Sequence, residues 1–306
     1  MKYIVQATAV WDFIYLPGSN SPIQAPGGAG FYAMCGMKVW EDAIEIVTGT
    51  GSDYLPNIKE WYDNNHLSID GFLFKEKETP RTIVRYSSED SREETSELGA
   101  QHYGHIEASP QEVAPFLQDA AGIYIFKNEN PTYWSEMLSL LQNREIPAMW
   151  EIASDAAKYE KIEAVRRIAE SIDVFSINRT EAMSLFHAND MAEVMHHFQS
   201  WEVPLIYLRM GSEGVCLMQA GRQVFVPSVQ GLNVVDTTGG GNASSGGAMI
   251  GYCRGCSLEE IGAMGNVSAS FIIEQWGVPK LFDETLHKEA EMRKKALLEM
   301  CAGEKV

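Results

Sequence analysis

Basic residues are scarce in this 306-residue chain. It has 24 Lys and Arg residues against 42 Asp and Glu residues, which gives a formal net charge of −18 at pH 7. Nucleic acids and anionic membranes both select clustered Lys and Arg, so this balance argues against either as a partner. A small anionic ligand is still compatible with the composition, because backbone amides at a helix start bind phosphate even in an acidic protein.

The chain also lacks an apolar run long enough to span a bilayer. Residues 3–16 are apolar but are interrupted by Asp12, and we expect a buried first strand there, not a signal peptide. Cysteine is sparse, with five residues scattered along the chain, which favours reduced thiols and a cytoplasmic protein. Cys253 and Cys256 have CxxC spacing, but the capping-box pattern at 257–260 predicts a new helix there, so we expect no redox pair.

Strand-like and helix-like segments alternate along most of the chain, which predicts an α/β fold with a mostly parallel central sheet and helices on both faces. The expected strands are 4–10, 44–48, 122–126, 148–152, 174–177, 205–208, 215–218 and 223–226. The expected helices are 131–142, 158–170, 180–186, 191–201, 258–275 and 284–300. Because no repeat or linker divides the sequence, we expect a single domain over residues 1–306.

The segment from about residue 69 to residue 103 interrupts this alternation. It carries β-type stretches at 71–74 and 82–86, followed by a charged run at 87–97 that we expect to be a solvated loop. The segment is therefore predicted to form most of a small β lid over a cleft. Exposed edges of such a lid could also pair across a homodimer.

The most informative segment is the run Asp-Thr-Thr-Gly-Gly-Gly-Asn at 236–242, between an apolar strand and a helix-compatible stretch. Consecutive glycines let a backbone approach a ligand closely, and the N–H groups at a helix start then bind an anion. We therefore predict an anion-binding turn at Gly239, Gly240 and Gly241. A second glycine cluster at 26–30 also precedes a helix, and a binding turn or a turn that only permits tight packing would both account for it.

In this order, these segments resemble the PfkB or ribokinase family of sugar and nucleoside kinases, and the likeness extends over nearly the whole chain. The family's late signature, Asp-Thr-Thr-Gly-Ala-Gly-Asp, is matched at 236–242, and its early glycine pair is matched by Gly27 and Gly28. The resemblance implies a ribokinase-like three-layer fold. It also implies phosphoryl transfer from ATP, with Mg²⁺ and optionally a monovalent cation, to a hydroxyl of a sugar, nucleoside or related small alcohol.

The resemblance further implies roles for individual residues. Those implied for the substrate are Asp12, Gly27, Gly28 and Tyr32, which stands where the family has Asn. Those implied for the nucleotide are Asn178, Glu181, Arg209, Gly211, Gly214 and Asn266. Asn178 and Glu181 match an Asn-x-x-Glu motif and would also hold Mg²⁺ through water, because Mg²⁺ keeps much of its hydration shell.

The catalytic turn would consist of Asn242 together with the three glycines before it, and Asn242 stands where the family has its catalytic Asp. An amide cannot accept a proton as a general base, and loss of a base slows a reaction by about 10²–10⁴-fold. Three outcomes agree with this residue: slow turnover by the remaining groups, substitution by another carboxylate such as Asp12, and a catalytically silent nucleotide- or metabolite-binding protein. A substitution that traps a complex is a further interpretation. If position 242 limits the chemistry, Asn242→Asp should raise kcat by at least about tenfold.

Overall fold

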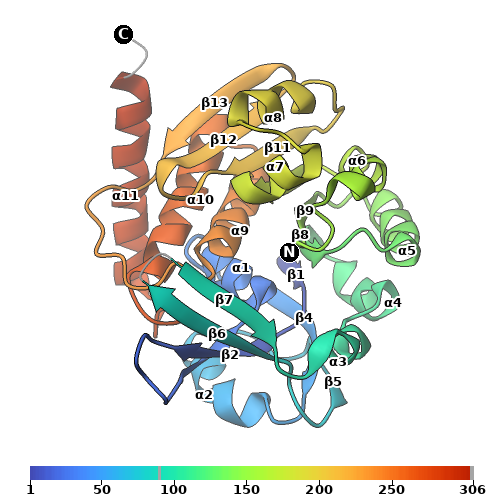
Figure 1. The fold of residues 1–306 in the computed structure, drawn as a ribbon, viewed down its shortest axis with the longest axis vertical. Coiled ribbons are helices and arrows are strands. Elements are labelled where there is room, and N and C mark those ends of the chain that lie inside the picture. The colour runs from blue at the N-terminus through green and yellow to red at the C-terminus, as the bar shows by residue number, and fades with distance from the viewer. Residues whose placement is uncertain (89–90, 304–306) are drawn as a thin grey trace.

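The computed structural model of the chain describes residues 1–88 and 91–303, and within them the strands form one sheet of nine and one of four. The nine-stranded sheet has the order β13-β12-β11-β10-β9-β8-β1-β4-β5 (Figure 1). Its strands pair in parallel, except that β12 is antiparallel to both β11 and β13. The strands are β1 Lys2–Gln6, β4 Ile44–Gly51, β5 Phe72–Glu76, β8 Ala120–Lys127, β9 Ala148–Ile152, β10 Val174–Asn178, β11 Leu205–Arg209, β12 Gly214–Gln219 and β13 Arg222–Pro227.

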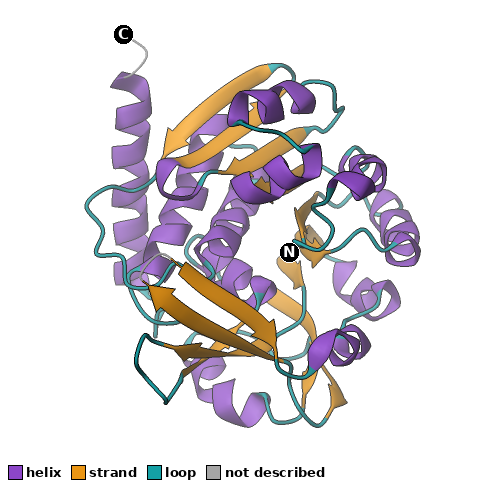
Figure 2. Cartoon of the chain, viewed as in Figure 1, coloured by secondary structure: helices purple, strands orange, loops and turns teal. Residues whose placement is uncertain are grey.

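Helices cover both faces of this sheet (Figure 2). The helices packed on one face are α1 Ala29–Lys38, α2 Leu55–Asn64, α9 Gly240–Cys253, α10 Leu258–Ile273 and α11 Glu284–Gly303. Those on the other face are α4 Pro110–Val113, α5 Pro131–Gln142, α6 Ile162–Ala169, α7 Arg179–Phe186 and α8 Met191–Phe198. The three-layer α/β architecture predicted from the sequence is therefore confirmed. Across the described residues, none of the helices combines the length and apolar character needed to cross a bilayer.

The second sheet has the order β3-β2-β6-β7 and stands apart from the first at the lower left of Figure 1. Its strands are β2 Val10–Tyr15, β3 Ile23–Gly27, β6 Arg81–Ser88 and β7 Ser91–Ser96. β2 and β6 are parallel, and the other two pairings are antiparallel. The helix α3 (Gly99–Ile106) follows this sheet along the chain.

The sequence-based bounds of this small sheet were wrong in three places. The expected first strand, 4–10, is in fact two strands, β1 and β2, that belong to different sheets. The stretch expected at 71–74 forms β5, an edge strand of the large sheet that pairs with β4. The charged run at 87–97 contains β7 and is not a loop, although residues 89–90 lie outside the described part. An antiparallel edge strand tolerates charged side chains, so composition alone could not identify it.

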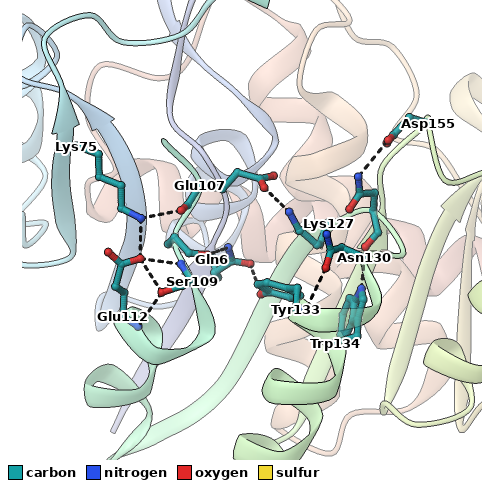
Figure 3. A network of polar contacts seen from close by, with 12 residues as sticks. Gln6, Lys75, Glu107, Ser109, Glu112, Lys127, Asn130, Tyr133, Trp134 and Asp155 are labelled. Atoms are coloured by element: carbon teal, nitrogen blue, oxygen red, sulfur yellow. Dashed lines mark hydrogen bonds and ion pairs between the residues drawn. The ribbon is translucent and has the colours of Figure 1, made fainter. Parts of the chain in front are cut away.

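A polar network connects β5 and β8 to the segment that follows α3 (Figure 3). Lys127, the last residue of β8, is 7% exposed, forms an ion pair with Glu107 and lies 5.2 Å from the centre of the Tyr133 ring. Lys75 of β5 donates hydrogen bonds to the carbonyl oxygen of Glu107 at 2.8 Å and to the carboxylate of Glu112 at 2.7 Å. These contacts fix the chain after the second sheet to the carboxyl ends of β5 and β8.

The junction between α9 and α10 has the capping box that the sequence predicts. Ser257 is the N-cap of α10, with Glu260 completing the box, and Gly255 adopts a φ of +67° just after α9. Burial, reinforced by the nearby Asp173, raises the pKa of Cys253 to about 12. A thiol with this pKa supplies almost no thiolate at neutral pH, which disfavours redox chemistry at the CxxC.

Close crossing of α1 and α9 depends on glycine. A Cβ on Gly36 would lie 2.0 Å from the carbonyl oxygen of Ala243, and one on Gly246 would lie 2.1 Å from that of Ala33. The two helix backbones therefore approach too closely for any other residue at these positions. The two helices that cross here both contribute residues to the cavity described below, Tyr32 from α1 and Asn242 from α9.

Candidate functional site

A cavity of about 540 Å³ is lined by residues from both sheets and from the first turn of α9. Asp12 and Asn242 line it together, as the sequence predicts for one small ligand. The other predicted site residues that line it are Gly28, Tyr32, Asn178, Glu181, Arg209, Gly211, Gly239 and Gly241. Asn178 and Arg209 end neighbouring parallel strands, and the carboxyl edge of such a sheet is where ligands collect in α/β folds.

The glycine turn begins α9, as predicted, but the apolar residues at 234–235 before it lie in a loop and not in the expected strand. Gly239 is the N-cap with a φ of +75°, and Gly240 and Gly241 are the first two helical residues. The first N–H groups of a helix have no intrahelical partner, and here they add to the positive end of the helix dipole. Gly241 is exposed and faces the cavity, so the turn can receive an anion.

Asp12 lies in the second sheet, on β2, and not in the single buried first strand that the sequence predicted for residues 3–16. It is 4% exposed, and the Tyr32 hydroxyl donates a hydrogen bond to its Oδ2 at 3.2 Å. Burial, together with the Asp12 charge, raises the pKa of Tyr32, so the phenol stays a neutral donor. Gly27 does not line the cavity. Its role is spatial, because a Cβ there would lie 2.0 Å from the Asp12 carboxylate.

Asn242 is hydrogen bonded to a carboxylate to which the sequence assigned no role. Its Nδ2 donates to Oε1 of Glu151 at 2.6 Å, and Glu151 is only 1% exposed. The same carboxylate accepts a hydrogen bond from the Tyr124 hydroxyl at 2.9 Å and forms an ion pair with Arg209 at 2.8 Å. The sequence pointed to Asp12 as the substitute carboxylate, but the acid in contact with Asn242 is Glu151.

One sequence signal could have identified Glu151. It is the single acidic residue within the otherwise apolar stretch 148–152 that forms β9, and the same kind of interruption drew attention to Asp12. Burial raises the pKa of Glu151, while the Arg209 guanidinium opposes that rise.

Arg209, at the end of β11, lies over the glycine turn. Its Nη1 is 2.6 Å from the position a Cβ on Gly241 would occupy, and the residue is 8% exposed. It forms ion pairs with Glu151 at 2.8 Å and with Glu181 at 3.6 Å, whereas its Nε has no hydrogen-bond partner among the described residues. Burial opposes the charge on the guanidinium, but the two carboxylates outweigh it and raise the pKa of Arg209. A permanent cation therefore stands beside the anion-binding turn.

The Asn-x-x-Glu motif is a capping box at the start of α7. Asn178 Oδ1 accepts the N–H of Glu181 at 2.9 Å, and Glu181 Oε2 accepts the N–H of Asn178 at 3.0 Å. Glu181 Oε1 accepts a hydrogen bond from Ser154 at 2.9 Å. Within the described residues, no cluster of three or more His, Cys, Asp and Glu side chains could hold a metal directly. Glu181 lines the cavity and is partly exposed, which is compatible with a hydrated Mg²⁺ held through water.

A second cavity of about 520 Å³ adjoins the first at the glycine turn, and Gly211, Gly214, Gly240 and Asn266 are among its lining residues. Apolar side chains that line it are Val229, Leu232, Val234 and Ile273. Asn266 donates hydrogen bonds to the carbonyl oxygens of Val226 at 3.0 Å and Pro227 at 2.8 Å, which holds one wall in place. The two cavities share Arg209, Gly211, Thr237 and Gly241, so the turn and the guanidinium lie at their boundary.

Known proteins share this sequence pattern and fold. The cytidine kinase of Thermococcus kodakarensis is 24% identical, covering 83% of this chain and 90% of its own length. The nucleoside kinase of Methanocaldococcus jannaschii is 25% identical, covering 87% and 88%. A putative ribokinase II from E. coli, solved in complex with ATP and Mg²⁺, superposes with a TM-score of 0.77 at 16% identity, covering 96% and 99%. A family model for the pfkB family carbohydrate kinases matches residues 20–282, and the chain therefore belongs to that family.

Proposed function

We propose that this chain transfers the γ-phosphoryl group of ATP to a hydroxyl of a sugar, a nucleoside or a related small alcohol. The observation that carries the proposal is the pair of adjacent cavities that meet at the glycine turn and at Arg209. The cavity with apolar walls suits a flat nucleotide base, and the cavity that holds Asp12 suits a hydroxylated acceptor. The relatives named as nucleoside and cytidine kinases support this class of acceptor.

Each site residue would have a separate role in such a transfer. Phosphoryl transfer passes through a loose transition state, so positioning and charge stabilisation supply most of the catalysis. The N–H group of Gly241 and the Arg209 guanidinium would stabilise the negative charge on the transferring group. Asp12 would accept hydrogen bonds from acceptor hydroxyls, and Asn242 would accept one from the reacting hydroxyl. Glu181 would hold a hydrated Mg²⁺ through water, and a bound ion would supply positive charge to the phosphates.

The second sheet would serve as the lid of this site. The residues that it contributes to the acceptor cavity are Val10, Asp12, Thr82 and Val84. Tyr86 of β6 donates a hydrogen bond to Asp236 Oδ1 at 2.6 Å, and the same oxygen accepts the N–H of Thr238 at 2.9 Å. The sheet is thereby joined to the loop that precedes the glycine turn. A homodimer through the lid, a monovalent cation and a cytoplasmic location stay predictions.

Asn242 favours a second candidate function, a catalytically silent protein that binds a nucleotide or metabolite, because the residue cannot act as a base. The test combines calorimetric titration of ATP with measurement of ADP formed in the presence of cytidine, adenosine, ribose and fructose. Acceptor-dependent ADP formation supports the kinase, and ATP binding without turnover on any acceptor supports the silent protein. Absence of ATP binding would contradict the kinase and would leave only a silent protein that binds a metabolite.

A further inference from the structure

Glu151 is a buried carboxylate that contacts both polar groups beside the glycine turn. Its Oε1 accepts a hydrogen bond from Asn242 at 2.6 Å and forms an ion pair with Arg209 at 2.8 Å, and its Oε2 accepts a hydrogen bond from Tyr124 at 2.9 Å. With partners on both oxygens and 1% exposure, it is poorly placed to take a proton from a substrate. Its contacts instead suit a residue that holds other groups in position.

The contact with Glu151 determines how Asn242 is turned. A carboxylate only accepts hydrogen bonds, so the amide must present its NH₂ group to Glu151. Its oxygen, which lies in the same plane on the other side of Cγ, then points away from the Glu151 carboxylate. The same carboxylate fixes Arg209, whose Nη1 lies over Gly241.

We propose that Glu151 is the positioning residue of the transfer site, and that it forms a carboxylate–amide pair with Asn242. We call this pair exchanged because the carboxylate is at position 151 and the amide is at position 242, where the family has its acid. The family's acid at position 242 is an amide in this chain, and the carboxylate stands across one hydrogen bond on β9. The pair keeps one negative charge beside Arg209. The inference rests on the proposed kinase function for its catalytic consequence, but the pairing itself rests on the contacts alone.

This pairing reverses the expectation that Asn242→Asp would accelerate the reaction. The substitution would place two carboxylates in a contact that is 2.6 Å long in the native pair. Carboxylates at this separation do not both ionise, and they share a proton with one strongly raised pKa. The other charged or titratable groups that face Glu151 are Arg209, Glu181 and Tyr124, and one guanidinium cannot balance a third carboxylate.

The kinetic test is a double-mutant cycle of Glu151→Gln, Asn242→Asp and the double variant, assayed with ATP and cytidine, adenosine, ribose and fructose. Each single variant should lower kcat by at least about tenfold, because misplaced groups at a transfer site have effects of that size. The double variant restores one carboxylate and one amide, so its kcat should return to within about threefold of wild type. KM for ATP should change little throughout.

Two kinetic results would overturn the proposal. If Asn242→Asp is faster than wild type whichever residue stands at 151, then position 242 acts alone. If kcat of the double variant is no higher than that of the slower single variant, then moving the carboxylate to position 242 does not replace what Glu151 does. A purely structural role for Glu151 would also fail to give rescue in the double variant.

A second measurement, of melting temperature against pH, needs no turnover. In Asn242→Asp the shared proton raises a folded-state pKa, so the folded state binds more protons than the unfolded state and stability falls as pH rises. The melting temperature of this variant should drop by about 4 °C more, relative to wild type, at pH 8 than at pH 5. The melting temperature of the double variant should follow that of wild type at both pH values. An equal extra drop at pH 8 in the single Asn242→Asp variant and in the double variant would overturn the pairing.

The matched control is Asn20→Asp, which makes the same charge change at an exposed residue in the turn between β2 and β3. It should follow wild type in kcat and in melting temperature at both pH values. Failure of the proposed function would appear separately, as wild-type protein that neither binds ATP in calorimetry nor forms ADP. The melting cycle would then still decide whether Glu151 and Asn242 form the exchanged pair.

Discussion

Gly239 should be the least replaceable glycine of the anion-binding turn, and Gly239→Ala tests this directly. Its φ of +75° lies in the left-handed region, and a Cβ there would lie 2.1 Å from the Tyr32 ring. Tyr32 is 2% exposed, and its hydroxyl is hydrogen bonded to Asp12, so the ring cannot move aside without breaking that contact. The substitution therefore combines backbone strain with overpacking at the cavity.

The two contributions can be separated with Gly18→Ala as the matched control. Gly18 has the same φ of +75°, but nothing lies within 4 Å of its added Cβ. Left-handed strain alone should destabilise Gly18→Ala by about 1–2 kcal/mol. Gly239→Ala should lose this amount and about 1–3 kcal/mol more from overpacking, which gives roughly 2–5 kcal/mol in all.

The assay is equilibrium unfolding in urea for both variants, followed by acceptor-dependent ADP formation at a temperature where both are folded. We expect Gly239→Ala to unfold at a clearly lower urea concentration than Gly18→Ala and to lose most of its kcat, since the displaced ring and turn both line the cavity. Equal unfolding midpoints for the two variants would refute the close contact between Tyr32 and the turn. A folded Gly239→Ala variant with wild-type kcat would refute the role of the turn in transfer.

Three further predictions concern charged groups. Asp12→Asn should weaken acceptor binding or turnover by about 10–100-fold, the range for a hydrogen bond to a charged group, while calorimetry shows unchanged ATP affinity. Glu107→Gln should lower the free energy of unfolding in urea by about 3 kcal/mol, because Lys127 is 7% exposed and would lose its carboxylate partner. Glu112→Gln should lower it by less, because Lys75 and Glu112 are both more exposed than the members of the Lys127 pair. Burial opposes ionisation of Glu112, but hydrogen bonds from Lys75 and from the neighbouring capping serine outweigh it and lower its pKa. Because the unfolded state then binds more protons, the stability that Glu112 contributes should be present above about pH 4.5 and lost as pH falls further, with a shallower loss in Glu112→Gln.

The parts of the fold that the sequence predicted are those set by local pattern. The run at 236–242 follows an apolar stretch and precedes a helix, and the structure begins α9 there with Gly239 as the N-cap. Ser257 and Glu260 have the spacing of a capping box, and they form one. In each case the decisive contacts join residues within one turn of each other, so a short window contains all the information.

The errors arose where a distant partner decides the structure. The stretch 71–74 has β character, but only its pairing with β4 shows that it belongs to the large sheet. The charges in the run at 87–97 obscured β7, which is a strand because β6 lies beside it. Strand preference depends on such neighbours more than on the residue types themselves, and no pattern within either segment distinguishes the two sheets.

Position 242 is a further case in which a residue distant in the sequence decides how a local pattern should be interpreted. Taken alone, an amide in place of an acid indicates a lost general base, which predicts slow or no turnover and a faster Asn242→Asp variant. Glu151 lies 91 positions away along the chain, and only the fold brings its carboxylate to 2.6 Å from the amide. The charge of the site is therefore a property of the pair, and Arg209, which contacts Glu151, depends on it as well. A substitution that restores the family's residue at 242 should consequently succeed only when position 151 is changed with it.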